Sequence, residues 1–596
     1  MKRYISIAIA VAAALCLTGC FHDFLDRSAQ GIAREVDLSN PVLMSTSIYS
    51  SFLNFSEAGG DAMLTMGEIA SDNALRGSTL SDLGGLRIDR MYNQFQNFCS
   101  INAASTNYIG SLWVDLYGGI GQANINLRSF DRLFPDMDPD LKKALVAENR
   151  LVRGLFYMFL VNTFGEVVLL PEEEVTPREY AELTNDKSIP ELYDCIVADM
   201  RAADDGLPTR DEWKSNFGME WQGRAHKGSG QGYLAKALLY QAANELYFNH
   251  DAAKAADCYN EIVQIVSNMD DSQLYPLYDD YEQMFRPEGN FCPESLFEVG
   301  TKSTTDGTTC FVGLRGCQPR NNNGVGRMGP TINLINQYEK DDAGNILDKR
   351  HYGTVLYGAA VPLAGMSYPG NNQPSRMIYG KTISGAPGAA SAVITGRGWP
   401  NRFGRKTVQP DPVPSVNITD PIYNPGGTNL KLLRMGEVLM IGAEAAYWAG
   451  NYDQARIWLK KVRTRAGLDN TAIDALSGQP LLDQIWKDKR LEIALEWSNR
   501  YYELVRIDKI YPGYMKAAMN AKVKDELDAI GAYLDHNTDN FTWVSIYSSA
   551  CPMTKESYRS LLPLCSELQI PKHYTLPIST KVFQTMLKVQ QTQYYR

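Results

Sequence analysis

The segment from Leu433 to Leu468 constrains the fold more than any other part of this chain. In its first half, apolar residues recur at the three- and four-residue spacing of one helical face. The residues of this apolar stripe are Leu433, Val438, Met440, Ile441, Ala445 and Tyr447. Ala443 and Ala446 are small enough to let a second helix approach closely. This half of the segment therefore predicts an amphipathic helix with a packed neighbour.

A second helix is expected after Gly450, because glycine readily takes the left-handed conformation that ends a helix. Tyr452 and Ala455 then stand where tetratricopeptide-like repeats place an aromatic and a small residue. The apolar face continues through Ile457, Leu459 and Val462. The segment therefore predicts a tetratricopeptide-like helical hairpin, which is a scaffold and not a catalyst.

Helical periodicity recurs along the rest of the chain, and stacked helix pairs of this kind bury one continuous core. The further periodic segments are 105–133, 140–164, 189–205, 232–246, 250–267 and 481–507. With the hairpin they make about four helix pairs. The predicted fold class is mainly α, a tetratricopeptide-like scaffold that carries a large inserted lobe of irregular loops and short strands.

The inserted segment, 270–429, is rich in Gly, Pro, Asn and aromatic residues, with runs such as RGCQPRNNNGVGRMGP and GRGWPNRFGRK. This composition suits turns and short strands, and the aromatic content opposes disorder. Loops whose ends are fixed by a rigid scaffold are favoured places for ligand contacts. We expect a signal peptide at 1–19, a tether at 20–40, helical regions at 41–269 and 430–596, and a ligand-binding lobe at 270–429.

The N-terminus has the pattern of a bacterial lipoprotein signal peptide. Lys2 and Arg3 precede an apolar run that is too short to span a bilayer and ends in LTGC at Cys20. We expect cleavage before Cys20 and lipidation of that cysteine, because several acyl chains anchor a protein stably without a spanning helix. No later apolar run in the sequence is long enough to span a membrane.

The formal net charge of −10 disfavours nucleic acid and anionic lipid headgroups as partners. Loss of Lys2 and Arg3 with the signal peptide would make the mature chain more acidic still. The cysteines are widely spread and predict no metal cluster. Cys310 and Cys317 bracket a short loop and could pair in an oxidising compartment, whereas unpaired cysteines acting as small buried hydrophobes are the alternative for the others.

Sugar binding needs flat aromatic faces against the apolar face of a pyranose, with amide, guanidinium or carboxylate groups that match its hydroxyls. Trp399 beside Asn401 and Arg402 is the best such combination in the irregular parts of the sequence. The other candidates are Tyr278, Tyr281, Tyr368, Arg87 and Tyr92. Each competes with a simpler role as a packing anchor, which is the commoner use of an aromatic residue in such a lobe.

Little in the sequence points to catalysis. The six histidines have no metal-ligand spacing, and HExxH, CxxC and GxSxG motifs are absent. GSGQG at 228–232 lacks the lysine of a P-loop and predicts a helix-entry turn, and the consecutive carboxylates at 172–174 indicate a solvated loop. DHNTDN at 535–540 lacks the glycine and the distal glutamate of a calcium loop. We therefore predict no enzyme, no cofactor and no metal site.

Four stretches, in the same order along most of the chain, resemble SusD/RagB-type outer-membrane nutrient-binding lipoproteins. They are ENRLVRGLFYMFLVNTFGEVVLLP from Glu148, LRMGEVLMIGAEAAYWAGNYDQA from Leu433 with the later VRTRAG, IWKDKRLEIALEWSNRYYELVRID from Ile485, and the closing strand YTLPIST from Tyr574. The departures are Trp497, Ser498 and Asn499 in place of the family's EG pair, and Ser579 in place of the second proline of LPIP.

The resemblance implies a surface lipoprotein that captures an oligosaccharide or polysaccharide and passes it to a SusC-like TonB-dependent outer-membrane transporter. Asp23 and Asp26 resemble the acidic stretch that family members carry after the lipidated cysteine, so we expect the protein at the outer membrane, lipid-anchored and exposed on the cell surface. A tetratricopeptide-type adaptor, a peptide-binding lipoprotein and a surface glycoside hydrolase are the other hypotheses. A hydrolase needs two carboxyl groups about 5 to 9.5 Å apart across a pocket. The sequence does not tell which glycan is bound.

Overall fold

The computed structural model describes residues 40–56, 65–75, 107–300, 328–357, 377–378, 381–382, 402–407, 428–496, 499–536, 541–545, 548–553 and 568–595. Long helices dominate these residues, and this confirms the predicted mainly α fold class. They are α6 (Asn107–Leu133), α7 (Pro139–Phe164), α9 (Ile189–Gly206), α11 (Lys227–Asn244), α12 (Ala252–Asp271), α16 (Met435–Trp448), α17 (Tyr452–Arg465), α18 (Gly478–Ile493), α19 (Arg500–Ile510) and α20 (Tyr514–His536). None of the described helices has the length and hydrophobicity needed to cross a bilayer.

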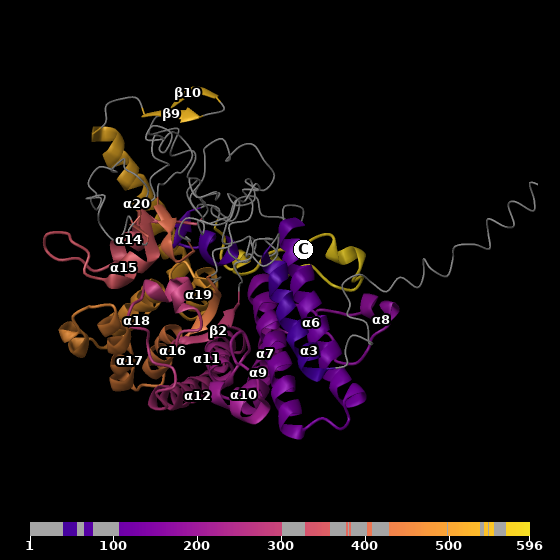
Figure 1. Cartoon of the computed structure of the whole chain (residues 1–596). Helices are drawn as coiled ribbons and strands as arrows, with labels where there is room; N and C mark the ends of the chain where they lie inside the picture. The colour runs from indigo at the N-terminus through magenta and orange to yellow at the C-terminus, as the bar shows by residue number, and fades with distance from the viewer. Residues whose placement is uncertain are drawn as a thin grey trace, which may run out of the picture.

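The long helices follow one another in a curved row (Figure 1). Helix α6 packs on α7, α7 on α9, α9 on α11, α11 on α12, α12 on α16, and α16 on both α17 and α18. Because each helix covers the apolar face of the next, one hydrophobic core runs through the whole row. This is the arrangement expected of stacked tetratricopeptide-like pairs.

The hairpin of α16 and α17 forms as the sequence predicts, with Gly450 at a φ of 77° between the two helices and Ala455 fully buried. Two details of the prediction are wrong. Leu433 belongs to a short strand before α16, not to the helix. Ile457 is 45% exposed, because Trp458 and not Ile457 occupies the buried position one turn after Ala455.

The segment 481–507, predicted as one helix, forms two helices. Helix α18 ends at Ile493, Leu495 takes a left-handed conformation with a φ of 59°, and α19 begins at Arg500. The backbone N–H of Leu495 donates to the Glu68 carboxylate at 3.2 Å, so a distant segment holds the break. The apolar period continues across it, and for that reason periodicity alone does not reveal it.

The GSGQG stretch lies inside the first turns of α11, which begins one residue earlier than this stretch, and not in an entry turn. A Cβ atom on Gly230 would lie 2.8 Å from the backbone nitrogen of Asp204, and one on Gly228 would lie 2.5 Å from the ring of Tyr275. The glycines therefore serve close packing of α11 against its neighbours, not phosphate binding.

Short elements connect the long helices. The short helices are α3 (Pro41–Thr46), α8 (Pro177–Ala181), α10 (Arg210–Phe217), α14 (Ile332–Gln337) and α15 (Lys349–Thr354). Tighter or wider helical turns are η2 (Ser47–Ser56), η3 (Thr65–Ile69), η5 (Glu245–Asn249), η6 (Gln283–Phe285), η7 (Pro287–Gly289), η10 (Arg405–Thr407), η11 (Thr471–Ala475), η13 (Lys572–Tyr574), η14 (Val582–Gln584) and η15 (Gln593–Tyr595). Helices α14 and α15 lie inside 270–429, where the sequence shows no helical period, because six residues are too few to reveal one.

All described strands are short and pair in antiparallel twos. The pairs are β1 (Ala74–Leu75) with β3 (Gly329–Pro330), β2 (Ser295–Val299) with β8 (Leu430–Arg434), β4 (Val355–Tyr357) with β7 (Arg402–Gly404), β5 (Met377–Ile378) with β6 (Lys381–Thr382), and β9 (Phe541–Ser545) with β10 (Ser548–Met553). The closing segment YTLPIST begins at the end of η13 and then continues without regular secondary structure, so it is not the predicted strand. It is tied to the end of α7 by the backbone N–H of Leu576, which donates to the Thr163 carbonyl at 2.7 Å.

Candidate ligand-binding lobe and its anchors

The two ends of the long insertion meet in the strand pair β2–β8. Strand β2 leads into the segment that follows residue 300, and β8 returns the chain directly into α16. Glu298 pairs with Lys431 across the strands at 3.0 Å, and both side chains are buried. The lobe predicted at 270–429 is therefore held at its base by a buried two-stranded ribbon that is continuous with the helical scaffold.

Helix α18 carries a buried set of charges that fastens the base of this lobe to the helices. Glu492 accepts from Arg434 of β8 and from Arg465 of α17, and it lies 3.9 Å from Arg350 of α15. Burial alone would raise the pKa of Glu492, but the guanidinium groups of Arg465, Arg434 and Arg350 hold it well below the usual range. Because Glu492 is ionised and multiply paired, it joins three elements at one buried point.

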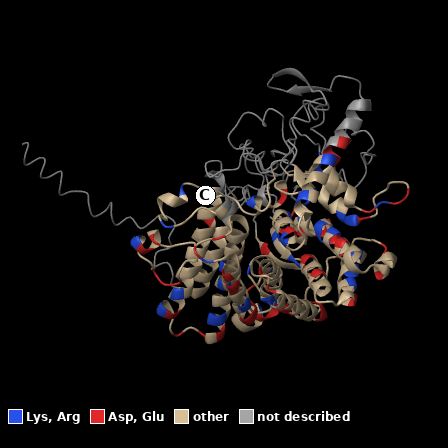
Figure 2. Cartoon of the chain, turned by 180° about the vertical axis from the view of Figure 1, so that it is seen from behind, with Lys and Arg blue, Asp and Glu red and all other residues tan. Residues whose placement is uncertain are grey.

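The other charged residues of α18 are paired in the same way. Asp488 accepts from Arg350 at 2.7 Å, Lys489 lies 2.7 Å from Glu503 of α19, and Arg490 lies 3.1 Å from Asp72. In Figure 2 basic and acidic residues are correspondingly interspersed over the helical scaffold and not gathered by sign. The KDKRLEIALE stretch that carries the family resemblance is therefore a buried ion-pair hub.

Tyr281, a predicted sugar-stacking residue, is part of this hub. It is 3% exposed, and its hydroxyl donates to the backbone carbonyl of Glu492. The cationic groups of Lys406, Arg434 and Arg465 lie 5.0, 5.5 and 4.7 Å from its ring centre. A ring that stacks on a sugar needs at least one face open to solvent. The buried Tyr281 ring has no open face in this structure. It is a packing anchor of the lobe.

Arg402 is likewise buried, with no exposed side-chain surface, on strand β7. Its guanidinium pairs with Glu526 of α20 at 3.0 Å. Two further pairs follow within four residues: Arg405 with Glu282, and Lys406 with Glu496 at 2.6 Å. The segment 402–407 is therefore fixed to three different elements, and Arg402 acts there as an anchor and not as a surface guanidinium.

Tyr278 is the predicted ligand residue that keeps a partly exposed side chain in the described structure. Its backbone is fixed, because its N–H donates to Glu294 at 2.7 Å and its carbonyl accepts from Arg465 at 3.4 Å. Tyr278 thus packs at the partly exposed edge of the cluster that buries Tyr281, and its role in ligand binding stays a prediction.

Several predicted residues lie outside the described part of the chain. They are Trp399, Asn401, Tyr368, Arg87 and Tyr92, the lipidation site Cys20, and the cysteine pair Cys310 and Cys317. In the sequence, Trp399 and Asn401 shortly precede the segment 402–407, which is held by the three ion pairs. Their roles in ligand binding stay predictions.

The acidic loop at 172–174 differs from its predicted solvated state at one residue. Glu172 accepts from Arg153 at 2.9 Å and also from Arg150. Burial alone would raise the pKa of Glu172, but these two guanidinium groups hold it below its usual value. Among the described residues no three His, Cys, Asp or Glu side chains are placed to hold a metal ion. Glu172 is thus an ion-pair partner of two arginines of α7.

Sequence reasoning did not single out the residues that anchor the lobe: Glu294, Arg434, Arg465, Glu492 and Glu526. The available signal was charge at positions that the helical or strand pattern makes apolar, as at Glu492 between Leu491 and Ile493. A buried charge is tolerated only when it is paired, so such positions indicate partners elsewhere in the chain.

Stacked helix pairs, joined by the β2–β8 pair to the insertion, define the class of fold as a helical-repeat scaffold. Two family models match the chain. The model of the SusD family matches residues 293–595, about half of the chain, and a model described as starch-binding and associating with the outer membrane matches residues 37–247. The chain belongs to the SusD family.

Individual relatives agree with this assignment. A SusD-like protein of Bacteroides ovatus is 21% identical in an alignment 492 residues long, and the match covers 76% of each chain. Surface glycan-binding protein A from Bacteroides fluxus has a similar structure, with a TM-score of 0.62 at 18% identity over 93% of this chain and 99% of that one. A laminarin-binding SusD-like protein gives 0.59 at 21% identity over 92% and 99%. These structural similarities show that the fold is shared.

Proposed function

We propose that this protein is a lipid-anchored, non-enzymatic glycan-binding protein of the outer-membrane surface. It captures an oligosaccharide or polysaccharide and delivers it to a SusC-like TonB-dependent transporter. Membership of the SusD family carries the proposal, and the surface glycan-binding and laminarin-binding proteins that share its fold support it. The outer-membrane association in the second family description supports the location.

The structure supports this role through the way the lobe is held. Its base is the β2–β8 ribbon, and segment 402–407 is pinned to η6, α18 and α20 or to their immediate neighbours by ion pairs. Loops with fixed ends can hold aromatic and amide groups in one arrangement, and this lowers the entropy lost when a sugar binds. Trp399 and Asn401 before the pinned segment, with Tyr278 at the edge of the hub, are the proposed contacts.

Affinity electrophoresis of the mature chain from Phe21 on a panel of polysaccharides tests the proposal, with calorimetry on each glycan that retards it. We expect one glycan to retard the protein, and Trp399→Ala to abolish that retardation. Tyr452→Ala is the matched control, because Tyr452 is 42% exposed on α17 of the scaffold. If no glycan retards the protein, the peptide-binding or adaptor hypothesis replaces this one.

Two companion measurements test the remaining parts of the proposal. Assay of released reducing ends on the glycan that binds should show no turnover, and release would establish a surface hydrolase instead. Mass spectrometry of the N-terminal peptide should find Cys20 acylated, and purification from detergent-solubilised outer membranes should recover the transporter with the protein.

A further inference from the structure

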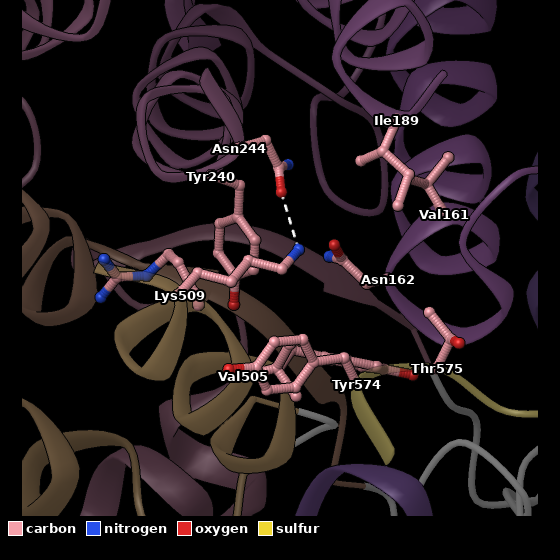
Figure 3. A pocket seen from close by; sticks show the side chains of 11 residues that line it. Val161, Asn162, Ile189, Tyr240, Asn244, Val505, Lys509, Tyr574 and Thr575 are labelled. Carbon is pink, nitrogen blue, oxygen red and sulfur yellow. Dashed lines mark hydrogen bonds between the residues drawn. The ribbon is translucent and has the colours of Figure 1, made fainter. Parts of the chain in front are cut away.

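A small cavity lies on the scaffold where the C-terminal ends of α7 and α11, the start of α9, helix α19 and the segment after η13 meet (Figure 3). About 20 Å³ of it is open to a water-sized sphere, which is room for one water molecule or one ion. None of its lining residues comes from the lobe at 270–429. The cavity therefore shares no lining residue with the glycan contacts proposed above.

Lys509 of α19 reaches into this cavity without a counter-charge. Its ammonium donates to Oδ1 of Asn244 at 2.7 Å, and the described residues provide it with no ion-pair partner. The ring centres of Phe248, Tyr247 and Tyr574 lie 5.2, 5.9 and 6.0 Å from its Nζ atom. The three aromatic rings and the Asn244 amide favour a cation but do not neutralise it. A positive charge on Lys509 is therefore not balanced by a negative charge of the described residues.

The neighbouring cation of the cavity shows the contrast. Arg506, one turn earlier on α19, pairs with Glu444 and with Glu503, each at 2.8 Å. Burial alone would lower the pKa of Arg506, but these carboxylates raise it well above the usual value. The charge of Arg506 is thus satisfied within the protein, and only Lys509 is left over in the described lining.

The side-chain oxygens of Asn162 and Asp508 already accept hydrogen bonds from other groups. The Tyr193 hydroxyl donates to Oδ1 of Asn162 at 2.6 Å, and this turns the Asn162 amide nitrogen toward the cavity. Figure 3 shows the Asn162 amide and the Lys509 ammonium pointing toward one another. The carboxylate of Asp508 accepts from the Tyr574 hydroxyl and from the backbone N–H of Met515. The cavity therefore offers donors from two elements to an occupant that only accepts.

We propose that this cavity is a binding site for a small monovalent anion, a halide or the carboxylate group of an organic acid, held by Lys509 and Asn162. The anion supplies the counter-charge that Lys509 lacks, and it accepts a hydrogen bond from the amide N–H of Asn162. The volume excludes larger groups from the innermost position, so a carboxylate enters with its oxygens first and its remainder outside. Hydrogen bonds from an ammonium to an anion are charge-assisted and short.

The protonation of Lys509 agrees with this geometry. Burial lowers its pKa from 10.5 to about 7, with no opposing charge. The other titratable or charged groups in the cavity lining are Tyr240, Tyr502, Arg506 and Tyr574. Outside the lining, Glu503 pairs with Arg506, Asp508 accepts from Tyr574, and the Tyr247 ring faces Lys509. Glu245 directly follows Asn244, and Lys572 and His573 directly precede Tyr574 in η13. Burial raises the pKa of Tyr502 to about 12, and burial beside Lys572 lowers that of His573 to about 4. Above pH 7 an anion must therefore bind together with a proton, and its affinity falls as the pH rises.

The test uses the mature chain in sulfate buffers free of halide, titrated by calorimetry with sodium bromide, sodium formate and sodium glucuronate. We expect binding of at least one of these anions, weaker by about tenfold for each pH unit above 7. Lys509→Met keeps the apolar stem of the side chain and removes the charge, so it should abolish binding. Lys516→Met is the matched control, because Lys516 is exposed on α20 and its loss changes the net charge equally.

The three anions separate the two sources of this chemistry. Bromide binding identifies a halide site, whereas formate and glucuronate without bromide identify a carboxylate site. A crystal soaked in bromide should show an anomalous peak next to Nζ of Lys509, and this readout does not depend on how well the variant folds. Binding that survives Lys509→Met, binding that is constant from pH 7 to 9, or absence of both heat and peak overturns the proposal.

Discussion

Glu68 provides a quantitative test of the buried charges in this fold. Its side chain is fully buried in η3, where Oε2 accepts from the Asn73 amide at 3.0 Å and from the backbone N–H of Leu495 at 3.2 Å. The other oxygen, Oε1, has no partner in the described structure. Burial raises the pKa of Glu68 from 4.5 to about 8, although these hydrogen bonds and the charges of Lys406 and Arg500 oppose the rise.

The pKa shift predicts a cost that grows with pH. Between pH 4.5 and 8 the unfolded chain releases the Glu68 proton while the folded chain keeps it, so the unfolded state binds fewer protons and stability falls as the pH rises. At about 1.4 kcal/mol per pH unit, the cost is about 1 kcal/mol at pH 5, about 3 kcal/mol at pH 7 and between about 4 and 5 kcal/mol above pH 8.

Glu68→Gln removes this cost, because glutamine resembles the protonated acid in shape and keeps an oxygen for Asn73 and Leu495. We expect the variant to gain little at pH 5 and about 3 kcal/mol at pH 7 relative to the native chain, with no further gain above pH 8. Urea unfolding at pH 5, 6, 7 and 8 measures the difference. Glu173→Gln, at an exposed position, is the control and should leave the curve unchanged.

A gain for Glu68→Gln that is the same at every pH would refute this reasoning. It would mean that Glu68 has the same pKa in the folded and the unfolded chain, and hence that water or a charge reaches the carboxylate. A loss of stability that increases with pH would mean the reverse: an ionised Glu68 that is paired in the folded protein.

Three further changes test the scaffold and its hub. Glu492→Gln removes the negative charge that holds Arg434 and Arg465, so the free energy of unfolding in urea should fall by about 3 to 5 kcal/mol. Asp528→Asn, at the exposed pair with Lys524, should lower it by less than about 1 kcal/mol. Equal losses for the two variants would contradict the buried hub. Gly119→Ala places a Cβ atom 2.0 Å from the Phe156 ring and should destabilise the fold by about 1 to 3 kcal/mol. Gly118→Ala, on the open side of α6, should stabilise the fold by up to about 1 kcal/mol. Thermal melts distinguish the two variants. Tyr281→Phe removes the hydrogen bond to the Glu492 carbonyl and should cost about 1 kcal/mol without changing glycan affinity; a loss of glycan affinity would return Tyr281 to the ligand site.

The helices of the scaffold were predictable because their signal is local. The apolar stripes of α6, α7, α12 and the α16–α17 hairpin repeat every three to four residues, and the end of α16 is marked by Gly450. The break between α18 and α19 escaped prediction, because a distant residue overrides the local pattern there. Glu68 fixes the break at Leu495 that separates α18 from α19, although no glycine or proline marks it.

For the ligand site, the sequence predicted which types of residue take part, but not which individual residues. The aromatic and amide content of 270–429 suggests sugar binding, but the same composition serves packing, and sequence does not separate the two uses. Tyr281 and Arg402 are buried because Glu492 and Glu526 come to them from other helices. Tyr278, three residues earlier than Tyr281, remains partly exposed because it lies at the edge of that cluster.

The sequence by itself determined the helical repeat scaffold, the family and the pattern of a lipoprotein signal peptide. Each of these depends on sequence patterns of residues that lie close together along the chain. Tertiary structure alone decided which charges are buried and paired, and which aromatic residues are anchors. Asp72 and Arg500 lie 428 positions apart and meet at 2.7 Å. The packing of α7, α11 and α19 leaves Lys509 without a counter-charge among the described residues. The strength of an ionic contact depends on distance and burial in space, and one sequence does not specify either for residues so far apart.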